Sequence, residues 1–138
     1  MNINAKNLIL GRVASLAAKK ALLGENVNIF NIDLAVVTDG KTTVEKYKHK
    51  LERGVDPSHG PFFPKTPIGI IKRTIRGMLP YKQERGIEAL ARIKCYMGIP
   101  VKFKDVKLET IEKANLSKLP KYDFTSLKDL SNQLGWKR

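Results

Sequence analysis

The chain has 138 residues, with 26 Lys and Arg against 13 Asp and Glu, a formal net charge of +13 and a pI of about 10.0. This length suits a single hydrophobic core, and so large a positive charge is typical of a protein with a polyanionic partner, for which nucleic acid is the first candidate. No apolar run approaches the roughly 20 residues of a membrane-spanning helix, and the N-terminus lacks the basic and apolar regions of a signal peptide. We therefore expect a cytoplasmic protein with no membrane partner.

The first predicted element is a helix over residues 8–23, where apolar residues recur at helical spacing. Its small residues on one side would let it approach a sheet closely. Gly24 is well suited to end this helix because glycine readily adopts the left-handed conformation. Residues 27–38 are β-branched and apolar, and they predict two short strands, or one strand that continues around a turn at Asp33.

Thr42, with Glu45 three residues later, has the spacing of a capping box and predicts a second helix that runs to about residue 51. Four prolines and two glycines then exclude a regular element from residues 53–67. Phe62 and Phe63 in this segment could stack on unpaired bases. More often such a pair anchors its own loop, and we favour anchoring.

Residues 68–77 predict a third helix, ended by Gly77 and Pro80, and residues 83–92 predict a fourth. Residues 93–100, "IKCYMGIP", are expected to form a buried strand that ends at Pro100. Strands that alternate with helices in this way favour an α/β domain with a largely parallel sheet.

Cys95 is the only cysteine, which excludes an internal disulfide framework. Because it lies in an apolar, strand-like stretch, we expect a buried and unreactive thiol. With only His49 and His59 beside it, the sequence offers no metal-ligand cluster. No metal site and no cofactor are therefore expected.

The C-terminal part divides in two. Residues 101–120 are polar and poorly periodic, and we expect them to wrap the surface. Further along, Leu127, Leu130 and Leu134 are spaced for a short docked helix, with Thr125 or Ser126 as its N-cap. We thus expect an α/β domain over residues 1–100 and a C-terminal extension over residues 101–138 that belongs to the same domain.

The positive charge is concentrated in residues 41–104, which hold fifteen Lys and Arg against five Asp and Glu. On a helical wheel at about 100° per residue, Lys72, Arg73 and Arg76 project from one side of the third helix and its apolar residues from the other. That apolar arc holds Ile70, Ile71, Thr74, Ile75 and Met78. No acid lies on this helix, whereas a merely soluble helix face would intersperse Glu with Lys. We therefore expect the three cations to contact phosphate, with backbone contacts dominating over base reading.

A second basic cluster is expected on the second helix and just after it. Phosphate contact and a solvated face are both open for this cluster, and we favour phosphate contact. The fourth helix serves as a comparison, because Glu88 lies four residues before Arg92 and the two should form a structural ion pair. The second cluster comprises Lys41, Lys46, Lys48, Lys50 and Arg53.

Motifs of catalytic and nucleotide-binding sites are missing from the sequence: there is no G-x-G-x-x-G, no G-x-x-x-x-G-K-[ST], no G-x-S-x-G and no convincing pair of acids. We therefore expect no enzyme. A DNA-binding helix-turn-helix over residues 73–93 is a competing reading, but Pro80 lengthens the turn and Glu84 opens the candidate recognition helix. Composition does not separate DNA from RNA, so a sequence-tolerant RNA- or DNA-binding regulator stays open as the alternative.

Residues 60–100, "GPFFPKTPIGIIKRTIRGMLPYKQERGIEALARIKCYMGIP", closely resemble the signature of the L-thirteen family of large-subunit ribosomal proteins, in its archaeal and eukaryotic form. The resemblance extends upstream through "LILGRVASLAAKKALLGENVNIFN" and to "LGW" near the C-terminus. Its most specific part is the block "RTIRGMLP" with "RG" three residues beyond the Tyr81-Lys82 pair.

The resemblance implies a three-layer α/β/α domain with a small, mainly parallel four-stranded sheet. It also implies a structural role in the large ribosomal subunit, with binding to ribosomal RNA, support of subunit assembly and contacts to neighbouring ribosomal proteins. Neither a cofactor, a small-molecule substrate nor catalysis comes with the family. Residues 101–120 are variable in the family and receive no role. The family's basic positions fall on Arg12, Lys65, Arg73, Arg76, Lys82 and Arg85.

Overall fold

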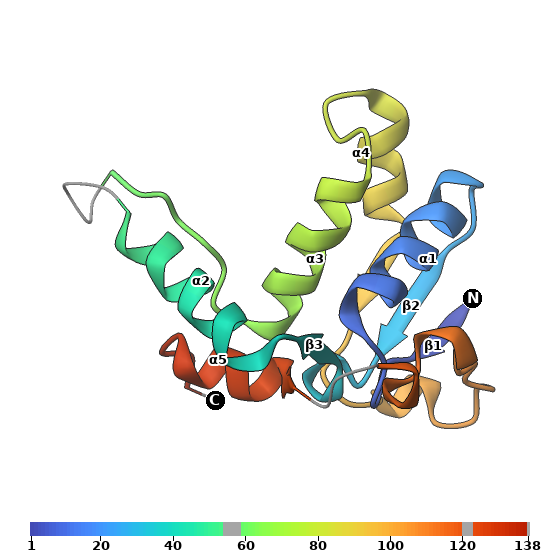
Figure 1. Cartoon of the computed structure of the whole chain (residues 1–138). Helices are drawn as coiled ribbons and strands as arrows, with labels where there is room; N and C mark the ends of the chain where they lie inside the picture. Colours follow the sequence, from blue (N-terminus) through green and yellow to red (C-terminus); the bar gives the residue numbers. More distant parts are fainter. Residues whose placement is uncertain (54–58, 120–122, 138) are drawn as a thin grey trace.

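The computed structural model describes residues 1–53, 59–119 and 123–137 (Figure 1). Its helices are α1 (Leu10–Leu22), α2 (Gly40–Glu52), α3 (Pro67–Met78), α4 (Glu84–Ala91) and α5 (Leu127–Gln133). Its strands are β1 (Asn2–Asn4), β2 (Val27–Phe30), β3 (Val36–Thr38), β4 (Ile93–Cys95) and β5 (Phe124–Ser126). Short 3₁₀ helices lie at Ile32–Leu34, Val101–Phe103, Glu112–Ala114 and Leu116–Lys118.

The strands form two separate sheets. β1, β2 and β4 make a parallel sheet with β2 in the centre, while β3 and β5 pair antiparallel. The expected α/β class with a mainly parallel sheet is confirmed, but the expected strand count of four is wrong, since this sheet has three strands in the described part of the chain. The chain leaves the sheet after β2 because Asn31 adopts a left-handed φ of 53° and a 3₁₀ turn follows. β3 is thereby directed towards β5, a strand of three residues that is too short for its alternation to show in the sequence.

The two faces of the parallel sheet are covered differently. Val27 and Ile29 belong to the main core, whereas Phe30 packs against Tyr96 and Phe103, with ring centroids 5.3 Å and 5.2 Å away. Phe103 lies in a 3₁₀ helix. At this point the second face is therefore covered by a 3₁₀ segment instead of the α-helical layer of a three-layer α/β/α arrangement.

The main core forms where α1 packs against α3, α4 and the sheet (Figure 1). α1 ends as predicted, just before Gly24, whose φ is 91°. The side of α1 turned to the core is made largely of alanines, and these small side chains let α3 approach closely. The residues of α1 in the core are Leu10, Val13, Ala14, Ala17, Ala18 and Ala21.

α3 begins and ends close to the predicted bounds. Thr66 caps it by accepting a hydrogen bond from the Gly69 amide at 3.1 Å. The helix continues one residue past Gly77, so the expectation that Gly77 ends it is wrong. Met78 is 44% exposed rather than buried with the isoleucines of the apolar arc.

α2 begins at Gly40, three residues before the start that an N-cap at Thr42 would give, so the capping box of Thr42 and Glu45 is wrong. Asp39 occupies the N-cap position with a φ of 54°. A Cβ at Gly40 would overlap the side chain of Thr125, because β5 packs directly on the start of the helix. This tertiary contact, which the local sequence does not reveal, sets where α2 begins.

The C-terminal helix docks on the domain, as expected. Residues 101–120 are expected to wrap the surface, but Ala114 of this segment enters the core. The Ile9 amide donates to the Ala114 carbonyl at 2.7 Å, and Ala114 is fully buried. Ser126 is the N-cap of α5, and Leu127 and Leu130 are buried in the main core. A domain description with a boundary at residue 100 stays a prediction, although residues on both sides of it share one core.

None of the helices in the described part of the chain combines the length and the apolar character needed to cross a membrane.

We predict that Gly86→Ala lowers the free energy of unfolding by about 2 kcal/mol or more, because its methyl group would overlap the backbone carbonyl of Pro80. Gly77→Ala is the matched control: nothing lies within 4 Å of a Cβ there, and alanine is the better helix former. It should raise the same free energy by about 0.5 to 1 kcal/mol. Denaturant unfolding measures both, and equal effects of the two variants would contradict this packing.

We also predict that Cys95 reacts slowly with iodoacetamide. Burial raises the pKa of the Cys95 thiol to about 11, and the nearby Lys72 only partly opposes this rise. The reactive thiolate forms only as the pH approaches that pKa, so alkylation at pH 8 should be roughly 100-fold slower in the folded protein than in urea. Comparable rates in the two conditions would show that the thiol is accessible and ionised.

Candidate nucleic-acid interface

The exposed side of α3 carries cations that have no acidic partner in the part of the chain that the structure describes. Lys72, Arg73 and Arg76 are exposed, and none of them forms an ion pair with any residue in the described ranges. The predicted ion pair on α4 is confirmed, with Arg92 Nη2 2.9 Å from Glu88 Oε2. The two helices therefore differ as predicted. Among the described residues, an ion pair neutralises Arg92 at the end of α4, whereas the cations of α3 form no ion pair.

Aromatic rings hold the two arginines of α3. The Cζ atom of Arg73 lies 3.9 Å from the ring centroid of Phe63, and that of Arg76 lies 5.2 Å from the ring centroid of Tyr81. A guanidinium stacked on a ring keeps the N–H groups at its edge free to donate. Both groups are thus restrained in position while their donors stay available to an anion.

Phe63 also joins α2 to this surface. The Nζ atom of Lys50 lies 5.7 Å from the centroid of Phe63 and 5.4 Å from that of Tyr47. Burial raises the pKa of Tyr47, and the positive charge of Arg73 opposes that rise, which indicates that α2 and α3 are close at this level. One ring therefore brings a lysine of α2 and an arginine of α3 together.

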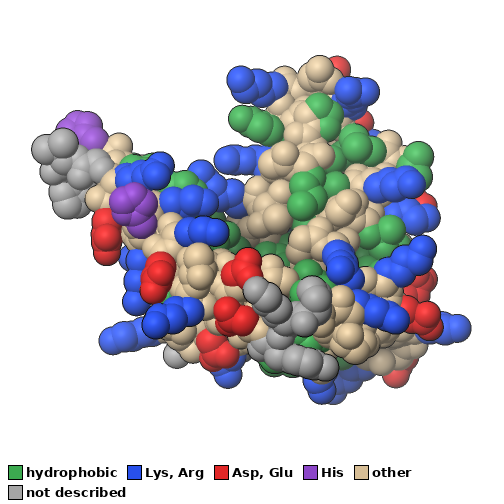
Figure 2. All heavy atoms as spheres, viewed as in Figure 1, with side chains coloured by type: hydrophobic (Ala, Val, Ile, Leu, Met, Phe, Trp, Pro, Cys, Tyr) green, Lys and Arg blue, Asp and Glu red, His purple; other side chains and the backbone are tan. Residues whose placement is uncertain are grey.

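We call this surface the cationic cleft and define it by Lys50, Phe63, Lys72, Arg73 and Arg76. In Figures 1 and 2, α2 forms one projecting arm of the molecule, and α3 with α4 forms another. Figure 2 shows Lys and Arg side chains on both sides of the hollow between these two arms. Three of the residues that define the cleft also line a depression of about 330 Å³ against α3, whose lining is Pro64, Gly69, Lys72, Arg73, Arg76 and Leu90.

The second predicted basic cluster is divided between two sides of α2. Lys46 and Lys50 lie about 40° apart around the helix, whereas Lys41 and Lys48 lie roughly 160° or more from Lys50. Lys41 and Lys48 instead line a separate depression beside α5. Arg53 follows the last residue of α2 and is exposed. Of this cluster, the helix geometry directs only Lys46 and Lys50 towards the cationic cleft.

The remaining predicted positions are spread more widely. Lys65 and Lys82 are exposed just before α3 and just before α4. Arg85 Nε donates to Gln83 Oε1 at 2.9 Å. Arg12 Nη1 donates to the Lys113 carbonyl at 2.6 Å, so this arginine is held against the C-terminal segment. Their contacts with RNA stay predictions.

The two phenylalanines before α3 have different environments. Phe63 is partly buried between cations and anchors the segment, as favoured, whereas Phe62 is 74% exposed. Sequence reasoning missed Tyr47 and Tyr81 as partners of the cations. Tyr47 lies three residues before Lys50 on one helix face, a spacing that could have revealed the pair.

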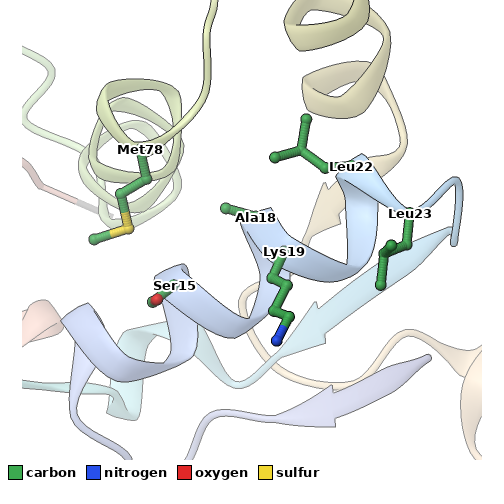
Figure 3. Close-up of a pocket in the computed structure, with 6 residues that line it drawn as sticks. All are labelled: Ser15, Ala18, Lys19, Leu22, Leu23 and Met78. Carbon is green, nitrogen blue, oxygen red and sulfur yellow. The ribbon is translucent and has the colours of Figure 1, made fainter.

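A third depression, of about 480 Å³, lies between α1 and the end of α3. Figure 3 shows Met78 facing it from α3, and Leu22 and Leu23 at the end of α1. Lys19 is the one cation among the residues that line it. This apolar surface is chemically unlike the cationic cleft.

No group of three or more His, Cys, Asp or Glu side chains suited to a metal ion is found in residues 1–53, 59–119 and 123–137.

Comparison with known proteins identifies the family. The family model described as "Ribosomal protein L13" matches residues 1–102. The large ribosomal subunit protein uL13 of Methanococcoides burtonii is 43% identical over 136 residues, which cover 98% of this chain and 97% of that protein. The uL13 protein of Methanosarcina barkeri is 44% identical over 137 residues (98% and 97%), and that of Haloarcula marismortui is 42% identical over 134 residues (96% and 89%). The chain belongs to the ribosomal protein L13 family.

The region that matches the L13 family model contains the whole cationic cleft and ends seven residues after β4. β5 and α5 lie beyond it, yet β5 packs on the start of α2 and α5 enters the core. In this L13 protein the C-terminal residues therefore support the part of the fold that carries the cations.

We predict that Phe63→Ala lowers the free energy of unfolding by about 1 to 2 kcal/mol, because it removes a partly buried ring together with its contacts to Lys50 and Arg73. Phe62→Ala, one residue away, should change it by less than about 0.5 kcal/mol, since that ring is largely in water. Denaturant unfolding of the two variants tests the assignment. A larger loss from Phe62→Ala would reverse the roles of the two rings.

Proposed function

We propose that this protein is a non-catalytic, structural constituent of the large ribosomal subunit that binds ribosomal RNA through the cationic cleft and supports subunit assembly. The observation that carries the proposal is the exposed side of α3, where Lys72, Arg73 and Arg76 have no acidic partner in the described residues and two aromatic rings hold the arginines. The relatives are named large ribosomal subunit protein uL13, and this name supports the proposal that the chain belongs to the large ribosomal subunit. Its place is then the cytoplasm, with neighbouring ribosomal proteins as further partners.

The physical basis of binding is charge neutralisation. RNA carries condensed counterions. When a lysine or arginine neutralises a phosphate, counterions are released, and this release favours binding. The gain becomes smaller as the salt concentration rises. The planar guanidinium groups of Arg73 and Arg76 can each donate two parallel hydrogen bonds to one phosphate. Lysines such as Lys50 and Lys72 act as point charges. Contacts of this kind position the protein on the RNA backbone and carry little sequence information.

The alternative, a regulator outside the ribosome that binds RNA or DNA, receives no support from the family relationship. A helix-turn-helix reading is further weakened by Glu84 in the first turn of α4, at the place where a recognition helix meets base edges. Tighter binding to a particular DNA duplex than to ribosomal RNA would revive this alternative.

We predict that the double variant Arg73→Gln/Arg76→Gln binds protein-free large-subunit rRNA more weakly and with a flatter salt dependence. Each lost phosphate contact should reduce the slope of log Kd against log salt by about one unit. Filter binding over a range of salt concentrations measures the slope. Thermal unfolding checks that this double variant and the control variant described next are folded.

Lys102→Gln/Lys104→Gln is the matched control, since it removes the same charge from exposed positions beyond β4. Its slope should stay near that of the unchanged protein. If both pairs flatten the slope equally, the effect belongs to net charge, and the cationic cleft is not the interface.

We also predict that the protein sediments with the large subunit on a sucrose gradient of a lysate and stays there after a moderate salt wash, because several contacts are held at once. Recovery of the chain only in the light fractions before any wash would contradict membership of the subunit.

A further inference from the structure

Phe62 has a position that loop anchoring does not explain. A single exposed apolar side chain is ordinary on a protein surface. Here, however, the neighbouring Phe63 anchors the segment through Lys50 and Arg73, and Phe62, the residue before it, is left 74% exposed. Its ring lies outside the core, and in sequence it directly precedes Phe63 of the cationic cleft.

The ring of Phe62 nevertheless lies close to the backbone of Gly60. A Cβ at Gly60 would lie 3.1 Å from both Cδ2 and Cε2 of the Phe62 ring, and Gly60 has a φ of 82°. Glycine at this position therefore permits both the turn and the close approach of the ring. One edge of Phe62 rests on Gly60, and most of the ring stays open to a ligand.

The charges around Phe62 favour a nucleic acid as that ligand. Lys50 and Arg73 contact the adjacent ring, and Lys65, three residues further along, is exposed. Figure 1 shows the segment before α3 running back beside α2 to the base of the α2 and α3 arms. A polyanion held by these cations would pass close to Phe62, whereas an apolar protein partner would have to cover the cations without neutralising them.

We propose that Phe62 is a stacking platform for an unpaired base of the RNA bound in the cationic cleft. This rests on the proposed function, because the cleft has to hold the RNA backbone before a base can reach the ring. Aromatic side chains recognise bases that are splayed out of a helix, and every base has a face that can stack. Phe62 thus selects unpaired over paired nucleotides, while the cations bind both.

The test compares Phe62→Leu, which keeps an apolar side chain without a ring, with Phe62→Trp, which keeps a ring. The probes are protein-free large-subunit rRNA and a blunt-ended RNA duplex without unpaired bases. Phe62→Leu should weaken binding to the rRNA by about tenfold, and Phe62→Trp should bind it as the unchanged protein does. The salt slope should be unaffected, since no charge is lost, and affinity for the duplex should be the same for all three proteins.

Two results would overturn the stacking proposal while leaving the proposed function intact. One is unchanged rRNA affinity in Phe62→Leu, with steep salt dependence still present. The other is an equal loss on the duplex, which would indicate a general disturbance of the segment. If the unchanged protein itself binds rRNA without salt dependence, the proposed function fails instead. Thermal unfolding of both variants, in which an exposed side chain is replaced, verifies that they are folded.

Discussion

The burial of three isoleucines on one side of α3 fixes the rotation of that helix, and the candidate interface depends on this constraint. Ile70, Ile71 and Ile75 are at most 1% exposed and lie in the core with the alanines of α1. An unpaired charge costs far more to bury than an isoleucine gains, so the helix cannot turn its cations inward. Lys72, Arg73 and Arg76 must then project together from the opposite side. The hydrophobic core thus creates a local concentration of charge that no acidic side chain in residues 1–53, 59–119 and 123–137 neutralises through an ion pair.

Aromatic residues restrain the cations that the core directs to the surface. Long basic side chains lose conformational freedom when they bind a ligand, and this loss opposes binding. Phe63 and Tyr81 restrain Arg73 and Arg76 beforehand, and Phe63 does so while contacting Lys50 from α2. These side chains therefore lose part of their conformational entropy during folding and lose less of it when they bind. The electron-rich face of Phe63 also attracts the positive charges of Lys50 and Arg73. This attraction offsets part of the repulsion between the two cations when no phosphate is bound.

The sequence predicts well those features that local spacing controls. The amphipathic pattern places the cations of α3 correctly, Gly24 adopts the left-handed φ expected after a helix, and the Glu88–Arg92 pair forms as its spacing indicates. Features set by distant partners were not predictable. α2 begins at Gly40 because β5 packs there, and β3 leaves the parallel sheet because its partner lies far along the chain. Within the site, the contacts of Phe63 were not predictable for the same reason. The two cations that this ring contacts, Lys50 and Arg73, come from different helices.

The division of the basic residues shows why net charge is a poor measure of an interface. The middle of the chain holds most of the excess positive charge, yet Lys41 and Lys48 lie beside α5 and Arg92 is engaged with Glu88. These residues contribute to the long-range field that attracts a polyanion, which salt screens over about 10 Å at 0.1 M. In the proposed function, the cations that converge on Phe63 and the outer side of α3 are those placed to neutralise neighbouring phosphates of one strand at contact distance. The salt dependence of binding should therefore count this smaller set, because counterion release follows contacts with phosphate and not the total charge of the protein.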